Sequence, residues 1–273
     1  MANTRELLGQ RYGNAAPSTA GAELTPVLET ILSHRSVRGF LGDALPAGTL
    51  ELLVAAAQSA ASSSNLQVWS VVSVEDPQRK ERVAHHAGNQ AHIREAPLFL
   101  AWLADTSRIA RIAERDGQPV DGLRFLDTFL MGAIDAALAA QNAVNAAESL
   151  GLGTVYIGAL RNHPEAVAQE LGLPKGVFPV FGLCVGKPDP SRPSAIKPRL
   201  AQSAVLHREQ YQERPLEHEV ARYDDVLKAF YDAQQQAHPR WSEHTRERLR
   251  GADSLRGRDR LKQALHGFGF ELL

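Results

Sequence analysis

Residues 146–162 have the sequence AAESLGLGTVYIGALRN, a short stretch that joins a helix to a strand. Its first letters close an alanine-rich run over about 125–150, which predicts the longest helix of the chain. Gly151 and Gly153 follow that run, and glycine commonly ends a helix because it accepts a left-handed backbone. The next letters, TVYIGAL at 154–160, predict a β-strand.

The long helix carries almost no charge, since Asp135 is the only ionisable residue between Met131 and Ala147. A helix that is apolar nearly all round must be buried on several sides. A domain of this size rarely wraps one helix completely. We therefore expect a subunit interface to cover part of it, in a homodimer.

Other segments alternate between short helices and apolar strands. Strands are predicted near 67–76 and over 177–186, and the run 97–105 is apolar on both faces, as a central strand would be. Helices and strands mix without a regular βαβ alternation. The sequence therefore predicts an α+β class, with a sheet of four or five strands between helices.

The composition is ordinary for a globular protein, with 44% apolar and 22% charged residues among 273. The 30 basic and 31 acidic residues leave no overall field to attract nucleic acid or an anionic membrane, so any anion site must be local. No apolar run approaches the roughly 20 residues that cross a bilayer, and the chain starts without an apolar centre, so we expect a cytoplasmic protein. The only cysteine, Cys184, is expected to be a buried, inert thiol.

The two ends of the chain differ from the middle. Residues 1–23 are rich in small and polar types without a sustained period, which predicts a loosely ordered arm. From about Leu216 the chain is charged and largely helical. Arginines there alternate with acidic residues, which favours a solvated helical face over a nucleic-acid patch.

The segment HRSVRGF, residues 34–40, places two arginines and a histidine close together. His34 and Arg35 suit the end of a helix, because cations complement the negative end of its dipole. That does not account for Ser36 or Arg38, although a surface turn would tolerate both.

Three further stretches point to a ligand. The serines of ASSSNLQ, 61–67, can be simple helix stops, but their hydroxyls and amides also suit a ribityl chain or a phosphate. Gly158, at a strand end, would let the backbone approach a flat ring closely. The cations of KPR, 197–199, stand in a proline-rich segment and would suit a dianion.

Together with FPVFGLCVGKP and IKPRL, these stretches and their order resemble the FMN-dependent nitroreductases. The resemblance is closest to the oxygen-insensitive nitroreductases and flavin reductases that use NADPH. It covers about 25–211, over half of the chain. It implies a three-layer fold with a central mixed or antiparallel sheet, an intertwined homodimer and an FMN-binding core over 25–211, with a helical extension over 212–273 that packs on the core. The arm over 1–24 has no counterpart in this resemblance.

The resemblance also implies site residues. Arg38 would lie near N1 and O2 of the flavin, where a guanidinium stabilises the negative charge of the reduced ring. The amide of Gly158 or Ala159 would face N5, and Gln90 would bond the pyrimidine edge. The positions that match the FMN site are His34, Arg35, Ser36, Arg38, Ser62, Ser63, Ser64, Gln90, Tyr156, Ile157, Gly158, Ala159, Leu160, Lys197 and Arg199.

On this resemblance Lys197 and Arg199 would hold the phosphate together with His34 and Ser36. Hydride would pass from NAD(P)H to the flavin and then to a nitroaromatic, a quinone or free flavin, in a ping-pong sequence without a catalytic side chain or a metal. The loop expected to read the 2′-phosphate of NADPH keeps only Arg240 as a cation, so the donor could be NADPH or NADH.

Two alternatives stay open. One is a flavin reductase that supplies reduced FMN to a partner monooxygenase. The other is a flavin-binding module without efficient NAD(P)H turnover, which the altered loop near Arg240 would favour.

Overall fold

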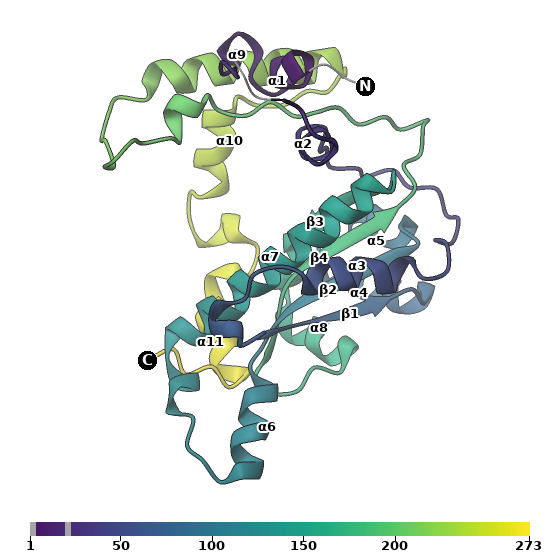
Figure 1. The fold of residues 1–273 in the computed structure, drawn as a ribbon, viewed down its shortest axis with the longest axis vertical. Helices are drawn as coiled ribbons and strands as arrows, with labels where there is room; N and C mark the ends of the chain where they lie inside the picture. The colour runs from purple at the N-terminus through teal and green to yellow at the C-terminus, as the bar shows by residue number, and fades with distance from the viewer. Residues whose placement is uncertain (1–3, 20–22) are drawn as a thin grey trace. The chain divides into compact units, whose positions relative to one another are not determined.

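The computed structural model describes residues 4–19 and 23–273. The chain divides into two compact units, one of residues 1–35 with 195–255 and a larger one of residues 36–194 with 256–273. Figure 1 labels their helices and strands. Within the described residues, no helix combines the length and the apolar character needed to span a bilayer.

The larger unit contains a four-stranded antiparallel sheet with the strand order β1-β2-β4-β3 (Figure 1). Its strands are β1 (Trp69–Val74), β2 (Leu98–Asp105), β3 (Gly153–Ile157) and β4 (Val177–Gly186). All residues of β2 are buried, and this strand lies between β1 and β4. The predicted α+β class, the number of strands and the central position of 97–105 are thus confirmed.

Helices cover both faces of this sheet and make three layers. Leu98, Leu100 and Trp102 of β2 pack in one core cluster with α3 (Thr49–Gln58) and α7 (Leu126–Ser149). Between them, Phe99, Ala101 and Leu103 point to the other face, where α4 (Pro77–His86), α5 (Ala91–Glu95) and α8 (Pro164–Leu171) supply the apolar partners. This alternation explains why the segment is apolar throughout: neither face of the strand meets water.

Helix α7 lies tightly against the sheet. A Cβ atom at Gly132 would come within 3.0 Å of the Ala104 Cβ and 3.1 Å of the Val68 carbonyl oxygen, so a larger residue there would have to push these groups apart by a few tenths of an ångström. Beyond the buried face, α7 exposes the large apolar side chains Leu130, Ile134 and Leu138, which are 44 to 55% accessible. Within one chain the helix is therefore covered on one side only.

The stretch 146–162 agrees with its prediction at the end of the helix and differs from it at the end of the strand. Gly151 adopts φ +75° just after α7, as expected of a helix stop. The strand, however, ends at Ile157, and residues Gly158–Asn162 form a 3-10 helix rather than continuing it. The pairing of β3 with β4 runs from Gly153 to Ile157 and ends there.

The other elements of the larger unit are short. Phe178 of β4 packs with Phe268 and Phe270, which follow α11 (Leu261–Gly267), and this contact holds the end of the chain against the sheet. The remaining elements are the helices α4 (Pro77–His86), α5 (Ala91–Glu95), α6 (Ser107–Asp116), α8 (Pro164–Leu171) and α11 (Leu261–Gly267), and the 3-10 helices Ser63–Asn65, Asp121–Arg124 and Arg258–Arg260.

The smaller unit joins the first helices of the chain to later ones. It consists of α1 (Thr4–Tyr12), α2 (Pro26–Leu32), α9 (Glu217–Ala233) and α10 (Trp241–Arg248), with an extended segment near 195–201 and 3-10 helices at Gly13–Ala15, Gln202–Ala204 and Ala252–Leu255. The predicted division into 1–24, 25–211 and 212–273 places its boundaries elsewhere and stays a prediction.

The N-terminal arm differs from its expectation over Thr4–Tyr12, whereas residues 1–3 and 20–22 of the predicted arm lie outside the described residues. Instead of a loosely ordered segment, the structure has α1, on which Leu7, Leu8 and Arg11 are buried, each 7% exposed or less. Only these few positions face inward and one of them is an arginine, so the hydrophobic period is too short to detect in the sequence.

Candidate functional site

The serine loop, residues 62–67, is held in place by a carboxylate on α7. Asp135, 1% exposed, accepts hydrogen bonds from the Ser62 hydroxyl at 2.6 Å and from the backbone N–H groups of Ser63 at 3.1 Å and Val68 at 3.3 Å. The Ser62 oxygen in turn accepts from the Gln67 N–H at 2.8 Å. The loop therefore depends on a residue that the sequence showed only as an isolated charge in an apolar helix.

The backbone of this loop is unusual. Ser64, Asn65 and Gln67 all have positive φ, between 48° and 54°, a region that non-glycine residues seldom occupy. Such conformations persist where the surroundings impose them, and here the Asp135 carboxylate does so. Ser63 and Ser64 remain exposed, so their polar groups are available to a ligand.

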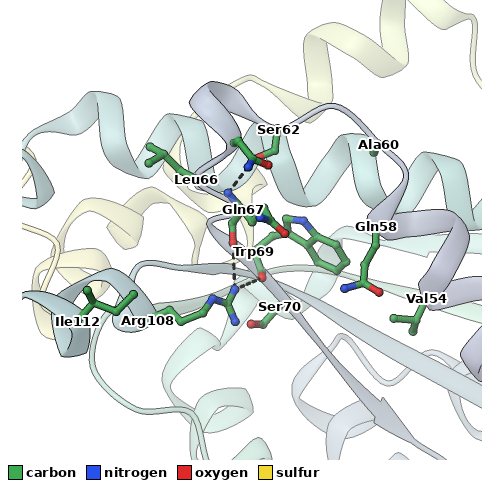
Figure 2. A pocket seen from close by; sticks show the side chains of 11 residues that line it. Val54, Gln58, Ala60, Ser62, Leu66, Gln67, Trp69, Ser70, Arg108 and Ile112 are labelled. Atoms are coloured by element: carbon green, nitrogen blue, oxygen red, sulfur yellow. Dashed lines mark hydrogen bonds between the residues drawn. The ribbon is translucent and has the colours of Figure 1, made fainter.

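A pocket of about 600 Å³ opens beside this loop (Figure 2). Ser62, Gln67 and Trp69 line it together with Arg108, whose guanidinium donates to the backbone oxygens of Gln67 at 2.9 Å and Trp69 at 2.8 Å. Val54, Gln58 and Ile112 complete a mixed apolar and amide lining. Arg108 thus helps to fix the outgoing end of the loop, where Asp135 also accepts a hydrogen bond from Val68.

Arg38 is presented to solvent from a firmly held segment. Val37 donates its N–H to the Thr154 oxygen at 2.9 Å and is 3% exposed, and Phe40, on the other side, is 4% exposed. Gly153 makes room for this, because a Cβ there would lie 2.7 Å from the Val37 side chain. Ser36 is exposed and pairs with Thr154 in an isolated bridge. Over the described part of the chain, the Arg38 guanidinium makes no hydrogen bond or ion pair.

The charge of Arg38 acts on His92 of α5. Burial lowers the pKa of His92, and the positive charge of Arg38 lowers it further. The Nε2 atom of His92 is buried and, among the described residues, has no hydrogen-bond partner. Gln90 uses its amide nitrogen to donate to the Ala87 oxygen at 2.9 Å.

The residues 156–160 offer mainly their backbone. The side chains of Ile157 and Leu160 are 1% and 0% exposed and belong to the core, and Ala159 is 8% exposed. Ile157 and Leu160 are expected to cover one face of the flavin ring. Since their side chains are buried, only their main-chain atoms are available for this contact. Ala159 is not among the described residues with positive φ, so its backbone does not require glycine. Tyr156 stays partly accessible, with its hydroxyl 3.3 Å from the Gln141 side-chain oxygen.

The remaining predicted cations lie in the smaller unit. Lys197 donates to the Tyr231 hydroxyl at 2.9 Å, and that ring stacks on His238 with centroids 4.0 Å apart. Arg199 is exposed and donates to the Lys197 and Pro198 oxygens at 3.2 Å. Arg35 is also exposed, whereas His34 is partly buried.

A residue outside the predicted set connects these cations. The Arg11 guanidinium donates at 2.9 Å to the carbonyl oxygens of Leu32, His34 and Lys197. The structure therefore brings the backbone of His34 and that of Lys197 together. Nothing in the sequence marked Arg11, because it lies in an arm without a detectable period.

Arg240, the predicted nucleotide contact, precedes α10. Its side chain is exposed, and its carbonyl oxygen accepts from the His244 N–H at 2.9 Å. The loop before it is ordered by Gln234, which donates to the Phe230 oxygen at 3.0 Å, and by the Gln236 N–H, which donates to the Tyr231 oxygen at 3.0 Å. The loop thus presents amides and a single arginine.

A second arginine that the sequence did not indicate lies in the larger unit. Arg258 donates from Nε to the Asn162 side-chain oxygen at 2.8 Å, and Asn162 ends the 3-10 helix that follows β3. Arg258 is thereby tied to the turn that contains Gly158.

Known proteins are similar to this chain in sequence. Residues 31–187 match the model of the Nitroreductase family, and residues 197–273 match the model of its C-terminal domain. An oxygen-insensitive NADPH nitroreductase of Salmonella typhimurium is 39% identical, over 83% of this chain and 92% of its own length. An FMN reductase (NADPH) of Bacillus subtilis is 40% identical, over 75% and 82%.

The solved structures agree. The NADPH:FMN oxidoreductase of Vibrio harveyi, determined in complex with NAD+, superposes with a TM-score of 0.81 at 37% identity, over 90% of this chain and 99% of that one. The two model matches together span most of the sequence, from residue 31 near the end of α2 to the last residue. This chain belongs to the Nitroreductase family.

Proposed function

We propose that this protein is an FMN-dependent NAD(P)H oxidoreductase that reduces nitroaromatics or quinones by two-electron transfer. The observation that carries this beyond family membership is Arg38, an exposed cation on a buried backbone segment that has no partner within the described residues. An unpaired guanidinium held between buried neighbours is suited to a ligand that brings negative charge.

The donor set fits FMN. The ring would meet the Arg38 guanidinium, the Gln90 amide and main-chain groups of 156–160, and the ribityl chain would meet the exposed hydroxyls of the serine loop. The phosphate, a dianion, requires cations and hydrogen-bond donors. We assign it to His34, Arg35, Ser36, Lys197 and Arg199.

Bound FMN would supply hydride transfer, from NAD(P)H to the flavin and from the flavin to the oxidant. The chain itself would bind, orient and stabilise charge. Arg38 would favour negative charge at the edge of the ring, and Asp135 would keep the serine loop in one conformation. Cys184 takes no part, since it is fully buried and burial raises the pKa of its thiol, as the sequence predicted.

A homodimer is part of the proposal. Leu130, Ile134 and Leu138 recur at every fourth position on α7, so they share one face, and they are exposed in the single chain. Large exposed apolar patches mark interaction sites. A second copy of the chain would bury this face. A cytoplasmic location, expected from the sequence, stays a prediction.

The flavin reductase alternative has support of its own. Relatives that are 39 to 40% identical carry the names NADPH-flavin oxidoreductase and FMN reductase (NADPH). The two activities differ in whether FMN stays bound between turnovers or leaves in reduced form. A flavin-binding module without turnover is favoured only by the amide-rich loop before Arg240.

The first experiment is an anaerobic titration of the FMN-loaded protein with NADPH and, separately, with NADH, followed by the visible absorption of the flavin. One equivalent of a donor should bleach the band. The ratio of the two rates reports whether Arg240 alone recognises the 2′-phosphate. Bound flavin that neither donor bleaches would contradict the proposal and favour the flavin-binding module.

A further inference from the structure

We propose that helix α1 braces the phosphate-binding segments of the smaller unit, with Arg11 as a positioning residue that sets how tightly the protein retains a phosphorylated flavin. The inference rests on the proposed function, because it takes His34, Lys197 and Arg199 as phosphate ligands. It concerns a helix outside residues 31–187 and 197–273, which match the family models.

The guanidinium of Arg11 is almost completely enclosed and donates to three backbone oxygens. Arg11 is 7% exposed. One terminal nitrogen, Nη1, donates to the Lys197 oxygen, while Nη2 donates to the oxygens of Leu32 and His34, each at 2.9 Å. The planar fork of arginine suits this arrangement, because its donors point in fixed directions.

Two of these oxygens lie at the end of a helix. Leu32 is the last residue of α2, and His34 follows it by two positions. The last carbonyl groups of a helix have no partner inside the helix, and a cation near them also complements the helix dipole. Arg11 thus caps α2 where the chain turns into the segment that carries His34 and Arg35.

Arg11 also accepts a hydrogen bond through its own backbone oxygen. The backbone N–H of Arg199 donates to the Arg11 oxygen at 2.8 Å, so α1 holds the Lys197–Arg199 segment from two sides. Leu7 and Leu8, 3% and 7% exposed, anchor the same helix in the unit. The segments of His34 and of Lys197, far apart in the sequence, therefore share one support.

This geometry has a consequence for binding. Cations hold a phosphate well only when their backbones are fixed before the ligand arrives, since otherwise binding must also order them. Without the guanidinium, three carbonyl oxygens lose a donor, and the segments of His34 and Lys197 lose the side chain that joins them, while the backbone contact from Arg199 to residue 11 remains. The loss should affect the binding of the FMN phosphate and leave the contacts to the ring and the ribityl chain unchanged.

The chemistry of the ligand makes the inference testable. Riboflavin has the ring and ribityl chain of FMN and lacks only the phosphate. We therefore expect Arg11 to control the ratio of FMN affinity to riboflavin affinity. A residue that merely stabilises the fold would lower both affinities together.

The experiment measures dissociation constants of FMN and riboflavin for the full-length apoprotein, by quenching of flavin fluorescence. Arg11→Ala should weaken FMN binding by about tenfold or more and change riboflavin binding by less than about twofold. Arg11→Lys keeps the charge without the fork, so it should also weaken FMN binding selectively. Gln10→Ala, at an exposed position of the same helix, is the matched control and should change neither constant.

Three results would overturn the inference: unchanged FMN affinity in Arg11→Ala, an equal loss of FMN and riboflavin affinity, or full FMN affinity in Arg11→Lys. If Arg11→Ala does not fold, Arg11→Lys alone decides. A wild-type protein that binds no FMN would instead overturn the proposed function, and the two failures are thereby distinguished.

Discussion

The carboxylate of Asp135 accepts a hydrogen bond of 2.6 Å from the Ser62 hydroxyl, and this contact joins α7 to the serine loop. Asp135 lies on the helix whose exposed face carries Ile134. One helix therefore provides both the support of a ligand loop and an apolar surface, so a change in its packing would reach the loop directly.

Asp135→Asn should destabilise the protein and weaken flavin binding. In asparagine an amide nitrogen, which is a donor, takes the place of one carboxylate oxygen. At the oxygen that accepts from Ser62 and Val68, this nitrogen would face two donors. A buried donor without an acceptor costs about 2 kcal/mol of unfolding free energy. Urea unfolding of the apoprotein and fluorescence titration with FMN measure the two effects. Asp127→Asn, an exposed position of α7, is the control. If both variants behave alike, Asp135 does not position the loop.

The sequence was most informative where one physical rule acts alone. The full burial of β2 follows from a run that is apolar at every position, and the end of α7 follows from Gly151. The end of β3 did not follow, because the letters GAL fit a strand as well as a 3-10 helix, and only the pairing with β4 decides.

The supports of the site were harder to predict than the site residues. Asp135 and Arg11 act through backbone groups that come from distant parts of the chain. Such contacts depend on the tertiary fold and leave no local pattern. Residues that face a ligand lie in short motifs, whereas residues that hold those motifs can come from any element nearby.

Arg38→Ala should leave the fold intact and impair flavin chemistry. The side chain is exposed and has no partner in the described part of the chain, so the unfolding free energy should change by less than about 0.5 kcal/mol. Loss of a charge-assisted contact at the ring edge should slow flavin reduction by about tenfold or more. Stopped-flow reduction by NADPH measures this. Arg115→Ala removes an exposed arginine that pairs with Asp116 and should have no effect on the rate. An unchanged rate in Arg38→Ala would remove Arg38 from the site.

His92 should make stability depend on pH. Burial and then the Arg38 charge lower the pKa of His92, while Glu95 opposes them. The unfolded chain, with a pKa of about 6.5, then binds the proton more readily than the folded one. The stabilisation is complete above about pH 6.5 and is lost as the pH falls toward the folded value, with a slope of at most about 1.4 kcal/mol per pH unit.

Two variants separate the causes. His92→Asn cannot titrate in this range, so its unfolding free energy should vary less steeply below pH 6.5. Arg38→Ala should move the pKa of His92 upward, which an NMR titration of the imidazole would detect. An unchanged slope in the first variant, or an unchanged imidazole titration in the second, would contradict this account.

Ile134→Glu should break the proposed homodimer. Ile134 is 55% exposed in the single chain and stands between Leu130 and Leu138 on α7. In a dimer that buries this face, a carboxylate would lose its hydration without gaining a partner, which costs several times the free energy of an apolar contact. The wild-type protein should therefore scatter light as a dimer and the variant as a monomer. Val120→Glu places the same charge at an apolar position, 36% exposed, in the segment between α6 and α7, and should remain dimeric. A dimeric Ile134→Glu would show that another surface joins the subunits, and a monomeric wild type would show that this face of α7 stays open to solvent.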